Sequence, residues 1–556
     1  MGHGCSTLEH SGSWSKGKIE CDRLPPVIWP VVSRYLIAAC LVASFVQSCF
    51  FAWAMVPDPD ETVHVFLGRM AIGGQISLFQ DELPGFRAPL PFYFFGLSQL
   101  VLDRSIVAAR ITSAAVGTLC LVLLMLFATR IGGRLCGILT LLFAITESTL
   151  IGSFAQSSYH ALTSLLLLTA LYLVFGTNVR HKHVLAMAAC SLLFFTRTLM
   201  MPVIPLAMLY LLWKAKTAAE RLAIVSIAIV PPLAFFLYDP RHLKFLAYVP
   251  LLDGVARAYG YQSPTRMMAP LRYDATNTPK GALVVLARWY KPWLVAVLVL
   301  AVSVAVIAVR GGRIRAFFSN GSVNVIAVIS MYLAVMHLVG SRGSWTGSVG
   351  YIASFGILVA VLLGFGFSTL IAEYCTRQIY QRTALVLLGA LFLWAPVASR
   401  PPALPRAISY DHSPTRDLTS LGDALRRTIP AESRIFNLGA TQALYIAGLK
   451  PYLRQNFGFN TLSSMSDDGI RARSGLWGEP EIRQWLVNDA DYAVIVPASL
   501  DGYRATCDAC VGLVESLLAR HFEQITVLPD YFSQAYIIYK RSGHRPRVSV
   551  EFPRAS

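Results

Sequence analysis

Long apolar runs separated by short polar loops occupy the chain from residue 31 to residue 398. A run of about 20 apolar residues is long enough to cross the hydrocarbon core of a bilayer as a helix. The first run is too long for a signal-peptide core and has no clear cleavage site, so we interpret it as an uncleaved span after a cytoplasmic tail, residues 1–30. We predict about eleven spans, at 31–55, 105–129, 134–153, 158–177, 183–199, 201–214, 222–238, 284–309, 322–340, 349–371 and 382–398.

The pattern changes after residue 399, where a proline-rich linker, residues 400–405, ends the apolar region. Amphipathic helix signals then alternate with short runs that favour strands. The helices are expected at 417–429, 442–447, 479–489 and 510–522, and the strands at 434–438, 492–496, 525–528 and 535–539. The predicted fold is a polytopic α-helical module, residues 31–399, followed by a small extracytoplasmic α/β domain with its tail, residues 400–556.

Composition supports this division. Hydrophobic residues make up 55% of the chain and charged residues 14%, whereas soluble domains carry about 25% charged residues. The mean hydropathy is +0.54, and the short alternating segments of a transmembrane β-barrel are not evident. The formal charge of +17 comes largely from short loops between apolar runs, where basic residues set topology and meet lipid headgroups. We therefore expect membrane lipids as partners and no nucleic acid.

The loop charges predict which side of the membrane each loop faces. Basic residues follow every even-numbered predicted span, and such loops remain on the cytoplasmic side. The loops 56–104 and 239–283, and everything after residue 399, then face outward. This assignment requires that the aromatic segment 89–103 lies at the membrane interface and does not cross. The basic residues are Arg130, Arg134, Arg180, Lys182, Lys214, Lys216, Arg221, Arg310, Arg313, Arg315, Arg377 and Arg382.

Three carboxylates crowd the exit of the first predicted span, in the sequence Pro-Asp-Pro-Asp-Glu at 57–61. Charged groups at the edge of a bilayer are costly and usually functional. The prolines keep the approach extended, and a helix is expected from Thr62 to Met70 with Asp60 near its cap. Asp60 and Glu61 are the catalytic candidates. The alternative is an ordinary N-cap with a first-turn acid.

His64 follows Glu61 by three residues, on the same face of the predicted helix. The Glu61 and His64 side chains could together bind a divalent metal ion, so metal dependence stays open and no other cofactor is assigned. The alternative is a surface histidine.

Further candidates for substrate binding lie in or beside the outward-facing loops. Arg87 precedes the aromatic segment, and a guanidinium at headgroup depth can bind a lipid phosphate. Tyrosines beside carboxylates suit sugars, which have apolar ring faces and many hydroxyls. The alternatives are interfacial anchors, structural residues and an ordinary tyrosine belt. The remaining candidates are His160, Arg197, Tyr259, Tyr261 and Arg342, with Glu147 and His337 predicted near the same face.

Ten cysteines are scattered along the chain, and Cys507 and Cys510 form a Cys-x-x-Cys pair. No second pair stands at zinc spacing, which argues against a structural zinc site. A disulfide in an extracytoplasmic domain and two unpaired thiols are both open.

The order of these motifs resembles the GT-C superfamily of glycosyltransferases. After the first span come Pro-Asp-Glu at 59–61, which opens a surface helix at 59–70, and Gly-Gly at 73–74. Arg-x-Pro-x-Pro with an aromatic helix follows at 87–95, and Ala-Ala-Arg-Ile-Thr-Ser-Ala at 108–114. Within the superfamily, the segment 50–180 is similar to the protein-mannosyltransferase and lipid A aminoarabinose-transferase branch, family 39.

The resemblance implies a glycosyltransferase of the bacterial inner membrane. It would move a hexose or pentose, with inversion, from a polyprenyl phosphate to an envelope lipid, glycan or protein on the non-cytoplasmic face. It assigns Asp60 as the catalytic carboxylate. An acid common between the third and fourth spans of family members is missing from residues 153–160, which leaves the donor sugar and the metal requirement open. The alternatives are a flippase for lipid-linked glycans and a non-catalytic envelope assembly protein.

Overall fold

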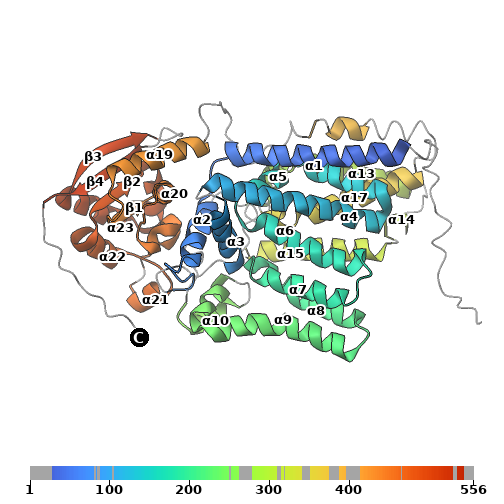
Figure 1. The fold of residues 1–556 in the computed structure, drawn as a ribbon, viewed down its shortest axis with the longest axis horizontal. Helices are drawn as coiled ribbons and strands as arrows, with labels where there is room; N and C mark the ends of the chain where they lie inside the picture. Colours follow the sequence, from blue (N-terminus) through green and yellow to red (C-terminus); the bar gives the residue numbers. More distant parts are fainter. Residues whose placement is uncertain are drawn as a thin grey trace, which may run out of the picture.

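The computed structural model describes residues 28–80, 83, 88–102, 105–248, 252–261, 278–309, 315–318, 320–340, 351–374, 387–392, 394–395, 414–464, 466–529 and 535–543. They form a helical bundle, residues 28–395, and a C-terminal α/β unit, residues 414–543. The two lie end to end along the longest axis of the molecule, with two short helices, α2 and α3, at their junction (Figure 1).

Six helices among the described residues are long and apolar enough to cross a membrane. Shorter apolar helices pack among them, joined by small helical segments. The six are α1 (Ile28–Ala54), α4 (Ile106–Thr146), α6 (Tyr159–Leu171) with its continuation η2 (Tyr172–Gly176), α9 (Ala218–Tyr238), α13 (Lys291–Val309) and α15 (Gly321–Gly340). The others are α5 (Ser148–Ala155), α7 (Lys182–Phe194), η3 (Thr198–Met200), α8 (Val203–Lys214), η4 (Pro240–Tyr248), α10 (Asp253–Ala258), α12 (Pro279–Trp289), α14 (Arg315–Phe318), η6 (Tyr351–Ser354) and α17 (Gly356–Tyr374).

The helices follow the predicted spans with two differences. The spans expected at 105–129 and 134–153 correspond to two helical parts of α4 that meet at a kink at Gly133, where φ is 83°, a backbone conformation that glycine adopts readily. The second of these spans is divided at Glu147 into the end of α4 and α5. The span expected at 284–309 is divided at Tyr290 into α12 and α13. Most of the last expected span, 382–398, lies outside the described residues, so the number of eleven spans remains a prediction.

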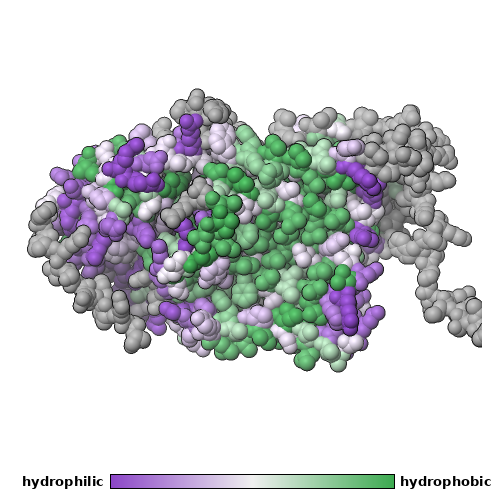
Figure 2. Space-filling view, viewed as in Figure 1, coloured by the Kyte–Doolittle hydropathy of each residue, from purple (hydrophilic) through white to green (hydrophobic). Residues whose placement is uncertain are grey.

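The sides of the bundle are apolar where they face away from the molecule. Large hydrophobic side chains are exposed along α9, among them Leu222, Ile229, Val230, Leu233 and Leu237. Figure 2 shows hydrophobic residues over most of the visible bundle and hydrophilic residues over the C-terminal unit and in a patch at the opposite end. An apolar band of this kind, on helices that satisfy their own backbone hydrogen bonds, suits a lipid surrounding. The chain is a multi-pass membrane protein.

At the junction, α2 (Pro59–Ile72) and α3 (Pro89–Val101) pack with their backbones in close contact. A Cβ atom at Gly68 would lie 2.0 Å from the Phe92 carbonyl oxygen, and one at Gly96 would lie 2.4 Å from the backbone of Gly68. Only glycine permits this approach. The segment 89–103, expected as an interfacial helix, is therefore a helix packed against the helix that carries Asp60 and Glu61.

The C-terminal unit is a four-stranded mixed sheet between two helical layers. The strand order is β1-β2-β4-β3; β1 pairs with β2 in parallel, with Ile435 opposite Tyr492, and the other pairs are antiparallel. Phe436 and Trp485 belong to the core on one side of the sheet, and Leu425 and Ile538 to the core on the other. The strands are β1 (Ile435–Leu438), β2 (Tyr492–Ile495), β3 (Phe522–Pro529) and β4 (Ala535–Arg541).

The predicted helices and strands of this unit correspond to observed elements with shifted ends. The helix expected at 510–522 corresponds to the second part of α23 (Leu500–His521), which has a kink at Cys507, and a disulfide joins Cys507 to Cys510. Of the two open alternatives for these cysteines, the structure has the disulfide. The other helices are α19 (Pro414–Thr428), α20 (Thr441–Ile446), η7 (Leu453–Thr461), α21 (Asp468–Arg473), α22 (Glu479–Arg483) with η8 (Gln484–Asp489), and η9 (Pro497–Ser499).

Gly68→Ala should destabilise the protein, because the new methyl group would push α2 away from α3. Overpacking of this kind costs about 1–3 kcal/mol, so we expect the thermal unfolding midpoint in detergent to fall by several degrees. The matched control is Gly512→Ala, in the helix α23, where a Cβ atom would meet nothing within 4 Å. A midpoint for Gly68→Ala at or above that of the wild type would contradict the close packing.

Candidate active site at the junction of the bundle and the C-terminal unit

The acidic sequence at residues 57–61 forms the start of α2. The Asp58 side chain accepts a hydrogen bond from Asp60 N (2.7 Å), and Asp58 N donates to Glu61 Oε2 (3.3 Å). This reciprocal arrangement is a capping box, and Pro59 occupies the first turn, where its missing N–H costs nothing. The expectation that the helix starts at Thr62 with Asp60 near its cap is wrong. Asp58 is the cap, and Asp60 and Glu61 both lie in the first turn.

Glu61 is fully buried and forms an ion pair with Arg110 of α4. Arg110 Nε donates to Glu61 Oε1 and Arg110 Nη2 to Oε2, both at 2.7 Å, so the guanidinium binds the carboxylate with two parallel hydrogen bonds. The backbone N and the hydroxyl of Ser157 also donate to Oε1, each at 2.7 Å. Charge-assisted bonds with this geometry are the strongest that proteins form between side chains.

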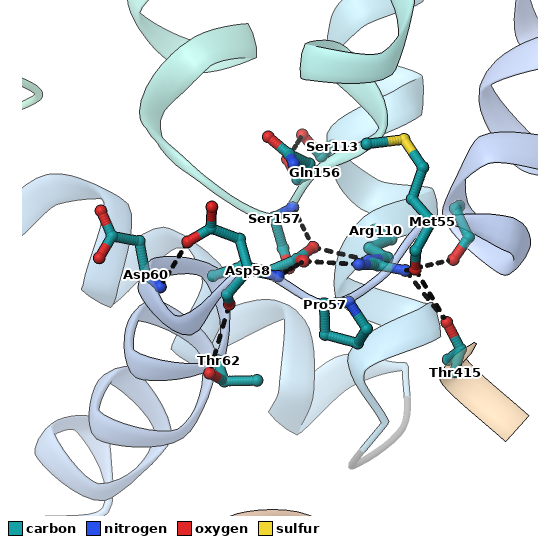
Figure 3. A network of polar contacts seen from close by, with 12 residues as sticks. Met55, Pro57, Asp58, Asp60, Thr62, Arg110, Ser113, Gln156, Ser157 and Thr415 are labelled. Carbon is teal, nitrogen blue, oxygen red and sulfur yellow. Dashed lines mark hydrogen bonds and ion pairs between the residues drawn. The ribbon is translucent and has the colours of Figure 1, made fainter. Parts of the chain in front are cut away.

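The remaining guanidinium nitrogen of Arg110 binds three oxygens from two other parts of the chain. Arg110 Nη1 donates to the carbonyls of Ala52 (2.8 Å) and Met55 (3.0 Å) at the end of α1, and to Thr415 Oγ1 (3.2 Å) in α19 (Figure 3). Arg110 therefore connects α1, α2, α4 and the C-terminal unit.

These contacts determine the charge state of Glu61. Burial alone would raise its pKa, but the Arg110 guanidinium and the hydrogen bonds from Arg110 and Ser157 outweigh burial, so the pKa of Glu61 lies below its ordinary value. Glu61 is therefore a carboxylate whose oxygens already accept these bonds. The catalytic and metal-binding roles expected for Glu61 from the sequence remain predictions.

Asp60 lies beside a cluster centred on the Tyr159 ring. Its side chain is half-buried and points away from Arg110 (Figure 3). The Arg197 guanidinium carbon lies 4.5 Å from the centroid of the Tyr159 ring, and the ring of His160 lies 4.4 Å from it. Asp60, His64 and Arg197 all lie within electrostatic range of His160. The structure thus brings together four of the residues that the sequence singled out.

His64 is not the surface histidine considered as its alternative. It is buried, and its ring lies 4.7 Å from the ring of Phe92 and 6.1 Å from that of Tyr159. Within the described part of the chain, no group of three or more histidine, cysteine, aspartate or glutamate side chains is placed to hold a metal ion. Glu61 faces Arg110, so the Glu61 and His64 pair gains no third ligand there.

The other predicted site residues are dispersed, except His337, which lies within electrostatic range of Arg197. Arg87 and Arg342 lie outside the described residues. Tyr259 is 57% exposed, whereas Tyr261 is buried, with Lys244 Nζ 5.7 Å from its ring centroid. His337 and Glu147 are fully buried in the bundle, and Glu147 caps α5 by accepting from Thr149 N at 3.3 Å.

The sequence analysis missed Arg110, Ser157 and Thr415. Arg110 had a signal, because a lone arginine in an apolar helix needs a buried acid as its partner, and the acids at 58–61 were candidates for that partner. Ser157 and Thr415 are ordinary hydroxyl residues far along the sequence, so no local pattern distinguishes them.

Comparisons with known proteins show that this chain is similar in fold to solved structures. No family model matches the chain, and no curated protein sequence matches it. The crystal structure of ArnT from Cupriavidus metallidurans bound to undecaprenyl phosphate is similar over 92% of this chain and 98% of its own, with 13% identity and a TM-score of 0.53. This chain therefore shares the fold of ArnT, a GT-C protein, which confirms the predicted resemblance at the level of the fold.

Two further structures match less well. The apo state of the same ArnT gives 13% identity, coverage of 92% and 97%, and a TM-score of 0.42. The apo oligosaccharyltransferase of Archaeoglobus fulgidus gives 12% identity, coverage of 92% of this chain and 75% of its own, and a TM-score of 0.44.

Arg110→Met should destabilise the protein strongly, because it leaves the Glu61 carboxylate buried without its cation. Removing one partner of a buried pair costs about 3–5 kcal/mol. The double variant Arg110→Met/Glu61→Gln should lose less than the sum of the two single variants, since the unpaired charge is then gone. Thermal unfolding of all four proteins measures the coupling.

The matched control for this cycle is the exposed pair of Arg241 and Asp239, where Arg241→Met should change stability little. Additive losses in the Arg110 and Glu61 cycle would contradict the coupling of the buried pair.

Proposed function

We propose that this protein is a membrane glycosyltransferase that transfers a sugar from a polyprenyl-phosphate donor to an acceptor in the cell envelope, with inversion. The observation that carries the proposal is the position of Asp60, a partly exposed acid at the end of the apolar bundle that meets the C-terminal unit, where both Asp60 and Arg197 lie within electrostatic range of His160. The shared fold supports it, since the ArnT structure that matches nearly end to end was solved with undecaprenyl phosphate bound.

The side chains at the junction suit a direct displacement. Asp60 accepts the proton of the acceptor hydroxyl or amine while that atom forms its bond to the anomeric carbon. The bond from the anomeric carbon to the phosphate oxygen breaks at the same time, and the phosphate leaves with the electron pair. Arg197 stabilises the charge that develops on the leaving phosphate. Attack opposite the leaving group inverts the anomeric centre.

The bundle suits a donor whose hydrocarbon chain stays in the bilayer. Its outer sides are apolar, and the acidic start of α2 lies where the bundle meets the polar C-terminal unit. Basic residues stand at the ends of α7 and α8 away from that junction, with Lys182 opening α7 and Lys214 ending α8. The positive-inside rule then favours a cytoplasmic location for these ends and an extracytoplasmic location for Asp60 and the C-terminal unit.

Asp60→Asn should lower sugar transfer about 10²- to 10⁴-fold, the usual contribution of a general base. Stability should change little, because the backbone N of Asp60, which donates to Asp58, is retained. The assay measures transfer of labelled sugar from a panel of polyprenyl-phosphate sugars in membranes with equal amounts of each protein. Asp501→Asn, the same exchange in the first turn of α23, is the matched control. Undiminished turnover by Asp60→Asn would remove the base from the proposal.

Cysteine labelling tests the sidedness. A cysteine at the exposed position Asp423 of α19 should react with an impermeant maleimide in spheroplasts of the expression host. A cysteine at Lys216, exposed between α8 and α9, should react only after permeabilisation. Both variants are compared with the otherwise identical chain without the new cysteine, and the reverse pattern would contradict the orientation.

A further inference from the structure

Two hydrogen bonds connect the C-terminal unit to Arg110, the partner of Glu61, and to Pro57, just before the acidic helix. Arg110 Nη1, which also binds the Met55 carbonyl, donates to the hydroxyl of Thr415, a residue only 2% exposed. Gln442 Nε2 in the first turn of α20 donates to the Pro57 carbonyl at 3.0 Å. Both contacts act on residues 55–58, the segment that leads directly into α2 and Asp60.

Backbone hydrogen bonds hold the two ends of this segment, where Met55 N donates to the Phe51 carbonyl and the Asp58 carbonyl accepts from Thr62 N. Pro57 and Pro59 have no backbone N–H to donate. Asp58 N donates to the Glu61 side chain, and the carbonyls of Met55 and Pro57 accept from Arg110 and Gln442. Since buried backbone groups need partners, side chains from other elements determine the path of the segment. The direction in which α2 starts follows from that path.

A third contact holds the body of α2 against the C-terminal unit. The rings of Phe66 in α2 and Tyr445 in α20 are stacked, with centroids 5.1 Å apart and planes 12° apart, and both are buried. At the far end, Lys450 Nζ donates to Gln75 Oε1 at 3.1 Å in an exposed contact. The C-terminal unit thus contacts the body of α2 and the residues just before and just after it, and it also binds Arg110, the partner of Glu61.

We propose that the C-terminal α/β unit positions the acid for transfer, and that Thr415 and Gln442 are its positioning residues. This inference rests on the proposed function, and it assigns to the C-terminal unit a part in the reaction of the bundle. A displacement of about 1 Å at a reacting group can lower a rate about 100-fold. Loss of either contact should therefore reduce kcat and leave the donor KM unchanged, because the lipid tail of the donor binds elsewhere.

The test compares Thr415→Val, which removes the hydroxyl at nearly constant volume, with Thr415→Ser, which keeps it. Gln442→Met removes the amide donor, and Lys450→Met is the matched control, because it breaks a contact between the same two parts at the other end of α2.

We expect Thr415→Val and Gln442→Met to lower kcat about three- to tenfold, the range of one lost hydrogen bond. Donor KM and the unfolding midpoint should stay at wild-type values. Thr415→Ser should restore kcat, and Lys450→Met should match the wild type.

Wild-type kcat in both Thr415→Val and Gln442→Met would overturn the inference. So would an equal loss in Lys450→Met, a fall in kcat that follows a fall in the unfolding midpoint, or a failure of Thr415→Ser to restore the rate. Each of these results would mean that the Thr415 and Gln442 contacts serve to hold the two parts together or to stabilise the fold, and that they do not position the acid.

A second measurement separates this inference from the proposed function. The rate at which a methanethiosulfonate reagent labels Asp60→Cys reports the surroundings of position 60 and needs no sugar substrate. Adding Thr415→Val or Gln442→Met should change that rate at least twofold, whereas adding Lys450→Met should not. An unchanged rate would overturn the positioning role. A wild-type protein that transfers no sugar from any donor would overturn the proposed function alone.

Discussion

The buried ion pair between Glu61 and Arg110 is the interaction on which the junction depends. Two charges taken out of water cost several kcal/mol each, and their attraction offsets this only where the remaining donors and acceptors are also satisfied. Here Ser157 and the Asp58 backbone N donate further hydrogen bonds to the carboxylate. Two carbonyls and the Thr415 hydroxyl accept hydrogen bonds from the guanidinium. One ion pair therefore fixes the positions of the end of α1, the start of α2, α4 and the C-terminal unit relative to one another.

The pair also explains why two adjacent acids have different surroundings. Consecutive residues on an α-helix point about 100° apart, so a first turn anchored through Glu61 directs Asp60 to a different side. Glu61 faces the interior with a lowered pKa, while Asp60 lies at the edge of the cluster of His64, His160 and Arg197. The arrangement lets a buried carboxylate provide rigidity and leaves its neighbour accessible to a substrate.

The sequence predicted the parts of this protein that depend on local pattern. The apolar runs located the described spans, and alternating signals located the strands of the C-terminal unit, because hydrophobic periodicity is set by neighbouring residues. The cap was misplaced by two residues, since Asp58 and Asp60 are both suitable caps and only the capping box with Glu61 decides between them. The bond from Arg110 to Thr415 could not be predicted, because Thr415 is 305 positions away and such contacts arise only when the chain is folded. The sequence leaves open a surface position for His64, because no local pattern shows that α3 packs over this side chain.

The contacts between the C-terminal unit and α2 affect geometry more than stability. If the unit moved away, water could bind the Pro57 carbonyl and the freed N–H of Arg110, and the net loss from each hydrogen bond would be small. The carbonyls would be satisfied, but their positions would no longer be fixed, and residues 55–58 would gain freedom just before the acid. A water-soluble unit attached after the last span can therefore control a site that most of its residues do not touch. The bundle holds Glu61, and the C-terminal unit restricts the segment from which Asp60 projects.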